Sequence, residues 1–268
     1  MKHLFVRFWL VILLLVCARM TPQSTATTQV STFTIDAPQL QGQKKIWIYL
    51  PNGYATSTKK YPVMYLHDAQ NLFDAKTSYV GEWNVDETLD SLNAKVIVVA
   101  IEHGNDKRID ELTPYKNEKY GGGKANAYLD FIVKTLKPEI DQKYRTKPKA
   151  KNTTIIGSSL GGLVSFYAVL KYPDVFGKAG IFSPSFWYTK DIYELAQQSP
   201  KIKTKLYFLC GDDEDENMVP DMQRMIAIVD QKNGSCKKRL TQTVIKGGKH
   251  NEKLWRENFA KAYLWLED

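Results

Sequence analysis

The sequence predicts an α/β fold: a mostly parallel central sheet with an antiparallel N-terminal edge and helices on both faces. Three observations support this prediction. From residue 61 onward, short apolar runs alternate with segments of helical periodicity, as in a parallel sheet covered by helices. Residues 33–35 and 45–50 are two earlier strand-like runs, which predict a hairpin at a sheet edge. Residues 153–164 predict a strand, a sharp turn and a helix in direct succession.

Length and composition predict one large domain with a full core. The chain has 268 residues, of which 43% are hydrophobic and 25% are charged, as is usual for soluble globular proteins. Removing the three basic residues Lys2, Arg7 and Arg19 from a net charge of +8 leaves +5 for the rest of the chain. The lysines are scattered rather than clustered, so we expect no nucleic-acid partner.

The first 26 residues have the pattern of an export signal. Lys2 and Arg7 precede an apolar run at 8–16, which is too short to span a bilayer comfortably, and Ser24-Thr25-Ala26 offers small residues for cleavage. Cys17 directly follows the apolar run, so a lipoprotein anchor is the alternative. We therefore expect an exported protein, periplasmic or secreted and possibly lipid-anchored. Residues 27–268 should form a single α/β domain without a membrane span.

The elements before residue 150 follow from periodicity and turn residues. After the hairpin and a turn at Pro51-Asn52-Gly53, we expect strands at 61–66 and 94–101 and helices at 87–92 and 126–145. Leu129, Ile132, Leu136 and Ile140 give the last helix its apolar face. Residues 102–124 are polar and glycine-rich, which predicts a long loop of the kind that is usually functional or mobile.

The elements after the central strand and helix continue the alternation. We expect strands at 179–182, 205–210 and 240–245, and helices at 190–198, at 222–229 after Pro220 and before Gly234, and through Trp255, Phe259 and Tyr263. Cys210 ends a buried strand and should be a core thiol, too far from Cys236 to form a disulfide.

The turn after the central strand carries a candidate nucleophile. Gly157-Ser158-Ser159-Leu160-Gly161 has the Gly-x-Ser-x-Gly pattern, and the small residues leave room for a strained turn that exposes Ser159. A helix that begins just behind the serine directs its N-terminal amides at any negative charge that forms there. The required context of strand and helix is present, so we expect Ser159 to be a nucleophile.

A serine nucleophile needs a base, and the chain offers one histidine after it. The histidines are His3, His67, His103 and His250, and only His250 follows Ser159 in the chain. It comes after the last expected strand, in a loop at the same sheet edge as the serine. We therefore expect His250 to be the general base.

The acid that orients this base should come from the loop after strand 205–210. The candidates are Asp212, Asp213, Glu214, Asp215 and Glu216. Most of them can be a solvated acidic turn before a helix, where carboxylates are favoured anyway. A position a few residues beyond the strand is best placed to reach the histidine loop, which favours Glu214. Asp213 and Asp215 remain open alternatives.

Two backbone amides should bind the oxyanion of an acyl-transfer intermediate. One is that of Leu160, directly after the nucleophile. The other should come from the loop after strand 61–66, where the small Ala69 permits a tight turn and Gln70 offers its amide. His67 and Asp68 in the same loop lack companion ligands, so we expect them to hold the loop rather than a metal ion. No metal site is predicted.

At this point the chain resembles the esterase D and enterochelin esterase group of α/β-hydrolases, which includes feruloyl and acetylxylan esterases and mycolyltransferases. The stretches that carry the resemblance lie between residues 33 and 268, at 61–74, 83–87, 108–114, 156–162, 182–187, 211–214, 250–252 and 255–256. Ala69 departs from the glycine that the group commonly has there. The resemblance implies an α/β-hydrolase fold, ester hydrolysis without metal or organic cofactor, and Glu214 as the acid.

The resemblance leaves the substrate open, and side chains near the matching stretches suggest candidates. Trp83, Phe186, Trp187 and Tyr188 would suit stacking on a sugar or aryl acid, and Arg108 would suit an anionic group. The hypothesis is an exported serine esterase that acts on acyl, acetyl or feruloyl esters of carbohydrates. A siderophore trilactone esterase and an acyltransferase that uses a sugar acceptor are the alternatives. A non-catalytic binding module would be expected to lack Ser159 or His250, and both are present.

Overall fold

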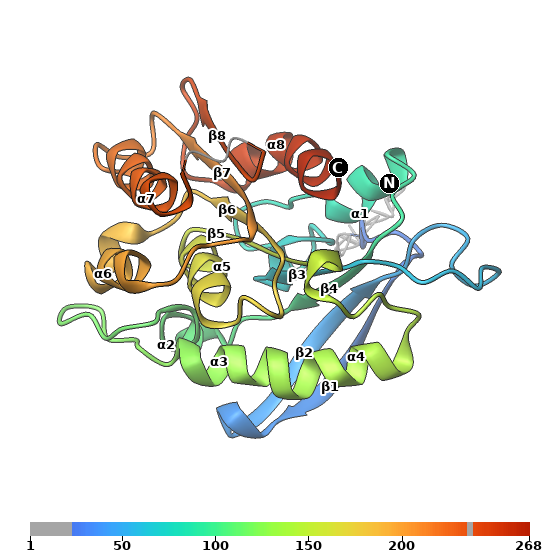
Figure 1. Ribbon diagram of the computed structural model, residues 1–268. Helices are drawn as coiled ribbons and strands as arrows, with labels where there is room; N and C mark the ends of the chain where they lie inside the picture. The colour runs from blue at the N-terminus through green and yellow to red at the C-terminus, as the bar shows by residue number, and fades with distance from the viewer. Residues whose placement is uncertain (1–22, 235–237) are drawn as a thin grey trace, which may run out of the picture.

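The computed structural model describes residues 23–234 and 238–268, which form one eight-stranded sheet with helices on both faces (Figure 1). The strand order across the sheet is β1-β2-β4-β3-β5-β6-β7-β8. The strands are β1 (Val30–Ala37), β2 (Gly42–Tyr49), β3 (Val63–His67), β4 (Ile97–Ile101), β5 (Thr153–Ser158), β6 (Lys178–Phe182), β7 (Lys205–Gly211) and β8 (Leu240–Ile245).

The predicted sheet is confirmed, including its antiparallel edge. β1 and β2 form a hairpin in which Val30 pairs with Tyr49, and β2 runs antiparallel to β4. Every pairing from β4 to β8 is parallel. Because these strands are parallel, their carboxyl ends lie at one edge of the sheet, and the loops that leave this edge form the site described below.

Alternate residues of each central strand enter two separate cores. On β3 and β4, Val63, Tyr65 and Val99 belong to one core, whereas Met64 and Val98 belong to the other. α1 (Val85–Ser91) and α8 (Glu252–Glu267) cover the second face. The first face is covered by α2 (Arg108–Leu112), α3 (Ala125–Phe131), α4 (Lys137–Lys143), α5 (Leu160–Lys171), α6 (Asp191–Gln198) and α7 (Met218–Asn233). Strands buried on both faces explain the nearly continuous apolar runs of the sequence.

Two predicted segments differ in detail from the structure. The expected loop at 102–124 contains a 3-10 turn (Asn105–Lys107) and the short helix α2, whose Glu111 is buried against Lys44 at 2.6 Å. The expected helix at 126–145 is α3 and α4 joined by a π-helical segment (Ile132–Leu136). Pro138 lies in the first turn of α4 and has no amide hydrogen to give to the preceding turn, which favours such a shift of hydrogen-bond register.

The N-terminal part of the described chain lies against the domain. Ser24 Oγ donates to Asp74 Oδ2 at 2.6 Å, and Thr25 Oγ1 donates to Glu82 Oε2 at 2.9 Å. Ser24 and Thr25 thus contact the loop between β3 and α1. Residues 1–22 with Cys17, and also Cys236, lie outside the described residues. Cys210 is fully buried, as predicted. Among residues 23–234 and 238–268, no helix is long and apolar enough to cross a bilayer.

Candidate active site

Ser159 lies on a strained turn between β5 and α5. Its φ of 58° and ψ of −122° are rarely adopted by a residue with a side chain, and its amide donates to the carbonyl of Phe182 at 2.9 Å. The glycines around it are required: a Cβ on Gly157 would lie 2.6 Å from the carbonyl carbon of Gly161, and one on Gly162 would lie 2.7 Å from the carbonyl oxygen of Phe182. The predicted strand, turn and helix are therefore confirmed.

His250 is paired with Glu214, the residue favoured among the five acidic candidates. The imidazole Nδ1 lies 2.6 Å from Glu214 Oε2, and the Glu214 side chain has no exposed surface. Its other oxygen, Oε1, accepts from the Ser183 hydroxyl at 2.7 Å and from the Gly211 amide at 2.6 Å. These hydrogen bonds fix the orientation of the carboxylate toward His250.

The other two open acidic candidates have different partners. Asp215 Oδ1 accepts from the amides of Asn217 and Met218 at 2.7 and 2.8 Å, so this carboxylate stabilises the first turn of α7. Asp213 is exposed, and its carboxylate lies 3.8 Å from Lys249 Nζ. Neither contacts His250 among the hydrogen bonds of the described residues.

Two supporting side chains were not predicted from the sequence. The Trp255 indole donates to Ser183 Oγ at 2.8 Å, and its ring meets the His250 ring edge to face, with the centroids 5.2 Å apart. Ser183 has a positive φ of 43°, which turns its hydroxyl toward Glu214. Both lie in stretches that carry the family resemblance, but only the folded chain shows that they support the histidine and its carboxylate.

The loop after β3 lies beside the serine and carries the expected second amide. Ala69 begins a 3-10 turn (Ala69–Asn71) and is fully buried. The Gln70 side chain is tied to the backbone of His103 by two hydrogen bonds of 3.2 Å. The backbone amides of Gln70 and Leu160 have no acceptor among the described residues. Both remain available as donors to a bound oxyanion.

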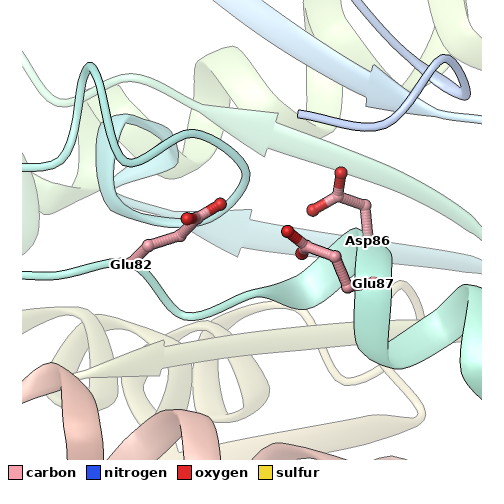
Figure 2. A group of neighbouring side chains, drawn as sticks. All are labelled: Glu82, Asp86 and Glu87. Atoms are coloured by element: carbon pink, nitrogen blue, oxygen red, sulfur yellow. The ribbon is translucent and has the colours of Figure 1, made fainter. Parts of the chain in front are cut away.

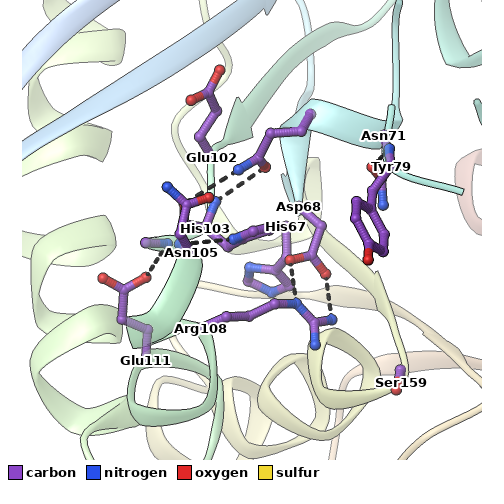
Figure 3. A network of polar contacts seen from close by, with 12 residues as sticks. His67, Asp68, Asn71, Tyr79, Glu102, His103, Asn105, Arg108, Glu111 and Ser159 are labelled. Carbon is purple, nitrogen blue, oxygen red and sulfur yellow. Dashed lines mark hydrogen bonds and ion pairs between the residues drawn. The ribbon is translucent and has the colours of Figure 1, made fainter. Parts of the chain in front are cut away.

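His67 and Asp68 hold this loop against α2 and α3 (Figure 3). Asp68 accepts a bidentate ion pair from Arg108, with Oδ1 to Nε at 2.7 Å and Oδ2 to Nη2 at 2.8 Å. Burial alone would raise the pKa of the Asp68 carboxyl, but the Arg108 guanidinium lowers it below its usual value. His67 Nδ1 lies 2.7 Å from the Tyr128 hydroxyl, and burial lowers the pKa of His67 to about 4. These contacts fasten the loop to Arg108 of α2 and Tyr128 of α3.

A pocket of about 670 Å³ joins these groups. Ser159 and His250 line it together with the Gln70 loop, and the aromatic side chains of Tyr79, Trp83 and Trp255 form part of its wall. The ionisable side chains that line it are those of His67, Asp68, His103, Asp106, Arg108 and Glu252, besides His250 and Tyr79. Arg108 is the only lysine or arginine among the described residues that line it.

The expected substrate-binding residues divide into two groups. Trp83 and Arg108 line the pocket, although Trp83 is only 3% exposed and Arg108 is paired with Asp68. Phe186 and Trp187 do not line it. Phe186 is fully buried in the core against Phe166, and Trp187 is 50% exposed outside the pocket. The structure corrects the expectation for these two residues, because periodicity cannot show which of several adjacent aromatic side chains turns inward.

The chain is similar to several curated proteins, among them one uncharacterized protein and two that are named as esterases. It is 29% identical to the uncharacterized protein YbbA of Bacillus subtilis over 238 residues, which cover 84% of this chain and 93% of the relative. It is 27% identical to an endo-1,4-beta-xylanase/feruloyl esterase of Xylanibacter ruminicola over 62% of this chain and 22% of that protein. It is 30% identical to the ferri-bacillibactin esterase BesA of Bacillus subtilis over 48% of this chain and 50% of that protein.

Solved structures share the fold. The BES protein from Bacillus cereus superposes with a TM-score of 0.72 and 18% identity, over 92% of this chain and 98% of that one. The enterobactin esterase FES from Shigella flexneri gives 0.70 and 16%, over 91% of this chain and 60% of that one. The fold is that of the α/β-hydrolase esterases. Since the family model described as "Putative esterase" matches residues 37–266, the chain belongs to that esterase family.

Proposed function

We propose that this protein is a serine esterase in which Ser159 is the nucleophile, His250 the general base and Glu214 the acid. One observation carries the proposal: the serine on the strained turn and His250, which is paired with the buried Glu214, line the same pocket at the carboxyl edge of the sheet. The family match supports esterase activity. The nucleophile and its partners rest on this geometry.

The geometry supports a two-step acyl transfer. Ser159 Oγ attacks the ester carbonyl carbon as His250 Nε2 accepts the hydroxyl proton. Glu214 at Nδ1 holds the imidazole in the required tautomer and stabilises its positive charge. The amides of Leu160 and Gln70 stabilise the tetrahedral oxyanion. His250 then gives its proton to the leaving alkoxide, and it activates the water that releases the acid from Ser159.

For the substrate, we propose acyl, acetyl or feruloyl esters of carbohydrates. The aromatic wall of Tyr79, Trp83 and Trp255 suits an aryl acid or the face of a sugar ring. Of the aromatic residues that the sequence suggested, Trp83 lines the pocket, whereas Phe186 and Trp187 do not. The name of one relative, an endo-1,4-beta-xylanase/feruloyl esterase, agrees with this class.

The alternative is a siderophore trilactone, which the name of another relative suggests. A ferric catecholate trilactone carries several negative charges and needs free cations in its pocket. Here Arg108 is engaged by Asp68, and Asp106 and Glu252 add negative charge to the same wall. This charge balance favours a neutral ester. An acyltransferase would use the same groups, with a sugar hydroxyl in place of water.

We also propose that the protein is exported, on the pattern of residues 1–26. The mass of the mature N-terminal peptide distinguishes signal cleavage near residue 26 from lipidation at Cys17.

The mechanism is tested by hydrolysis of a short-chain aryl ester. We expect Ser159→Ala to lower kcat/KM by about 10⁴-fold or more, because the nucleophile is lost while the fold is kept. Ser199→Ala, on the remote C-terminal end of α6, is the control and should keep the wild-type rate. Equal rates for Ser159→Ala and the wild type would overturn the mechanism.

The substrate class is tested by comparing acetylated xylan, methyl ferulate and a catecholate trilactone under one set of conditions. We expect a higher kcat/KM on one of the first two than on the trilactone. The opposite order would assign the siderophore alternative. Transfer of the acyl group to an added sugar in preference to water would assign an acyltransferase, and binding without turnover of any ester would indicate a binding module.

A further inference from the structure

A second group of carboxylates lies outside the proposed catalytic residues, where the loop after β3 enters α1. Glu82, Asp86 and Glu87 each offer a carboxylate oxygen, and these oxygens lie within 4.8 Å of one another. Figure 2 shows the three carboxylates directed toward a common space. Glu82 is 6% exposed and Asp86 is fully buried. Buried carboxylates that gather without a countercharge are costly, so the arrangement requires an explanation.

The hydrogen bonds divide each carboxylate into a bound and a free oxygen. Glu82 Oε2 accepts from Thr25 Oγ1 at 2.9 Å, Asp86 Oδ2 accepts from the Thr27 amide at 2.7 Å, and Glu87 Oε1 accepts from Asn84 Nδ2 at 3.2 Å. The second oxygen of each, Glu82 Oε1, Asp86 Oδ1 and Glu87 Oε2, is buried and accepts no hydrogen bond from a donor of the described residues. The Asp86 and Glu87 carboxyls lie close enough to hydrogen-bond to each other when one of them is protonated. Each carboxylate is therefore held in place by a protein donor and has one oxygen left for another ligand.

No basic side chain of the described residues forms an ion pair with the group, although the charge of Arg256 partly offsets the effect of burial on the pKa of Glu82. None of the ion pairs among residues 23–234 and 238–268 involves these three carboxylates. The guanidinium of Arg256 donates instead to the backbone carbonyl of Glu82 at 2.7 Å. Burial raises the pKa of the carboxyls of Glu82 and Asp86 above their usual values. The free oxygens thus call for a positive charge that the described side chains do not supply.

We propose that Glu82, Asp86 and Glu87 bind a Ca²⁺ ion. Carboxylate oxygens are the ligands that this cation prefers, and the cluster offers no nitrogen or sulfur donor that would favour a transition metal. Oxygens at 2.3–2.6 Å from one Ca²⁺ lie no more than about 5 Å apart, which agrees with the observed spacing. The Thr27 hydroxyl is also buried without a partner, next to Asp86, and is a candidate fourth ligand. Water would complete the shell.

The ion would tie the N-terminal segment to the wall of the pocket. Thr27 reaches the cluster from before β1, and Thr25 does so in a chain that is not cleaved near residue 26. Glu82 directly precedes Trp83, which lines the pocket. The role assigned to the ion is structural: it neutralises the cluster and fixes this segment and loop. The proposal does not depend on the catalytic roles of Ser159 or His250.

The test is calcium binding to the full chain that retains residues 24–27, after removal of divalent ions with a chelator. In calorimetric titrations, we expect one Ca²⁺ per chain and weaker binding of Mg²⁺, which requires a stricter octahedral shell. Saturating Ca²⁺ should raise the thermal midpoint by about 5 °C. Asp86→Asn and Glu87→Gln should each weaken calcium binding by at least about 10-fold, because affinity depends on the number of charged ligands.

Two controls separate this site from general attraction to acidic surfaces. Glu216→Gln removes an exposed carboxylate from the acidic loop after β7 and should leave the affinity unchanged. Without calcium, Asp86→Asn should melt no lower than the wild type, because it removes an uncompensated buried charge. The proposal is overturned if the wild type shows no heat of binding and no change in thermal midpoint at about 5 mM Ca²⁺. This concentration exceeds the dissociation constants of even weak protein calcium sites. Equal loss of binding in Glu216→Gln and Asp86→Asn would overturn it too.

Discussion

At the scale of single residues, the pair of His250 and Glu214 shows how a carboxylate is selected from an acidic run. Five acidic residues follow β7, and all would be compatible with a solvated turn. Glu214 alone extends inward to Ser183 Oγ and the Gly211 amide, and its other oxygen meets His250. The two donors to Glu214 come from the residue after β6 and from the last residue of β7, so they are far apart in the chain. This explains why chain position favoured Glu214 without excluding its neighbours.

We expect Glu214→Gln to lower kcat on an aryl ester by about 10³-fold or more, because an amide at this position favours the wrong tautomer of His250. Asp213→Asn and Asp215→Asn also replace a carboxylate of this loop by an amide, and their kcat should stay within about 3-fold of the wild-type value. Circular dichroism of each variant checks that the loop change has not unfolded the chain. An unaffected Glu214→Gln together with an impaired Asp213→Asn or Asp215→Asn would reassign the acid.

At the scale of elements, the contact of β7 with the turn after β8 sets the position of the histidine loop. Gly211 ends β7, and a Cβ there would lie 2.0 Å from the carbonyl oxygen of Gly248. The amide of Asp213 donates to that carbonyl at 3.0 Å, so the two loops are also hydrogen-bonded. Close backbone approach at Gly211 therefore brings Glu214 and His250 together.

We expect Gly211→Ala to separate these loops and to lower both stability and activity. Overpacking of this kind typically costs about 1–3 kcal/mol, and a shift of His250 should lower kcat/KM by at least about 10-fold. Gly42→Ala is the matched control, because the nearest atom to its added Cβ is 4.0 Å away. Urea unfolding and aryl-ester kinetics on both variants measure the two effects. A Gly211→Ala protein as active as Gly42→Ala would show that this contact does not position the histidine.

The elements that the sequence predicts well are those whose apolar pattern extends over several turns or a whole strand. Strands β3 to β8 and helices α5 and α8 follow directly from such patterns. The short helix α2 does not, because its five residues are held by Lys44 of β2 through Glu111, a contact far apart in the chain. The π-helical segment depends on one proline, and propensity alone does not reveal a shift of hydrogen-bond register.

The site residues likewise divide into those that a local sequence pattern identifies and those that depend on contacts far apart in the chain. Ser159 and His250 are recognisable because the motif and the chain order single them out. Ser183 and Trp255 are not, since each acts only through its contact with the other and with Glu214 or His250. The cluster of Glu82, Asp86 and Glu87 has the same character, because its donors come from the segment before β1.

At the scale of the whole molecule, ionisable groups buried in the domain should make its stability depend on pH. His67 is fully buried between β3 and α3, faced by Asp68, Arg108 and Tyr128. Burial lowers its pKa to about 4, whereas an unfolded histidine titrates near 6.5. Between these values the unfolded chain binds a proton that the folded chain does not. His67 therefore lowers the free energy of unfolding as pH falls from about 6.5 to about 4.

The size of this effect follows from the two pKa values. At pH 5.0 the unfolded state gains about 2 kcal/mol relative to pH 7.5 from His67 alone. His103, whose pKa is also lowered mainly by burial, acts in the same direction. The carboxyls of Glu82, Asp86 and Glu252 act in the opposite direction, because burial raises the pKa of each. The pH dependence of the wild-type unfolding free energy is the sum of these contributions, so a variant is needed to isolate that of His67.

We expect His67→Asn to lose about 2 kcal/mol less unfolding free energy than the wild type between pH 7.5 and 5.0. The Asn amide can replace Nδ1 in the contact with Tyr128 but takes up no proton. The measurement is urea unfolding at both pH values. Val63→Ala, a buried position on the same strand, controls for lower overall stability and should keep the wild-type pH dependence. Equal pH dependence in His67→Asn and the wild type would mean that folding leaves the proton affinity of His67 unchanged.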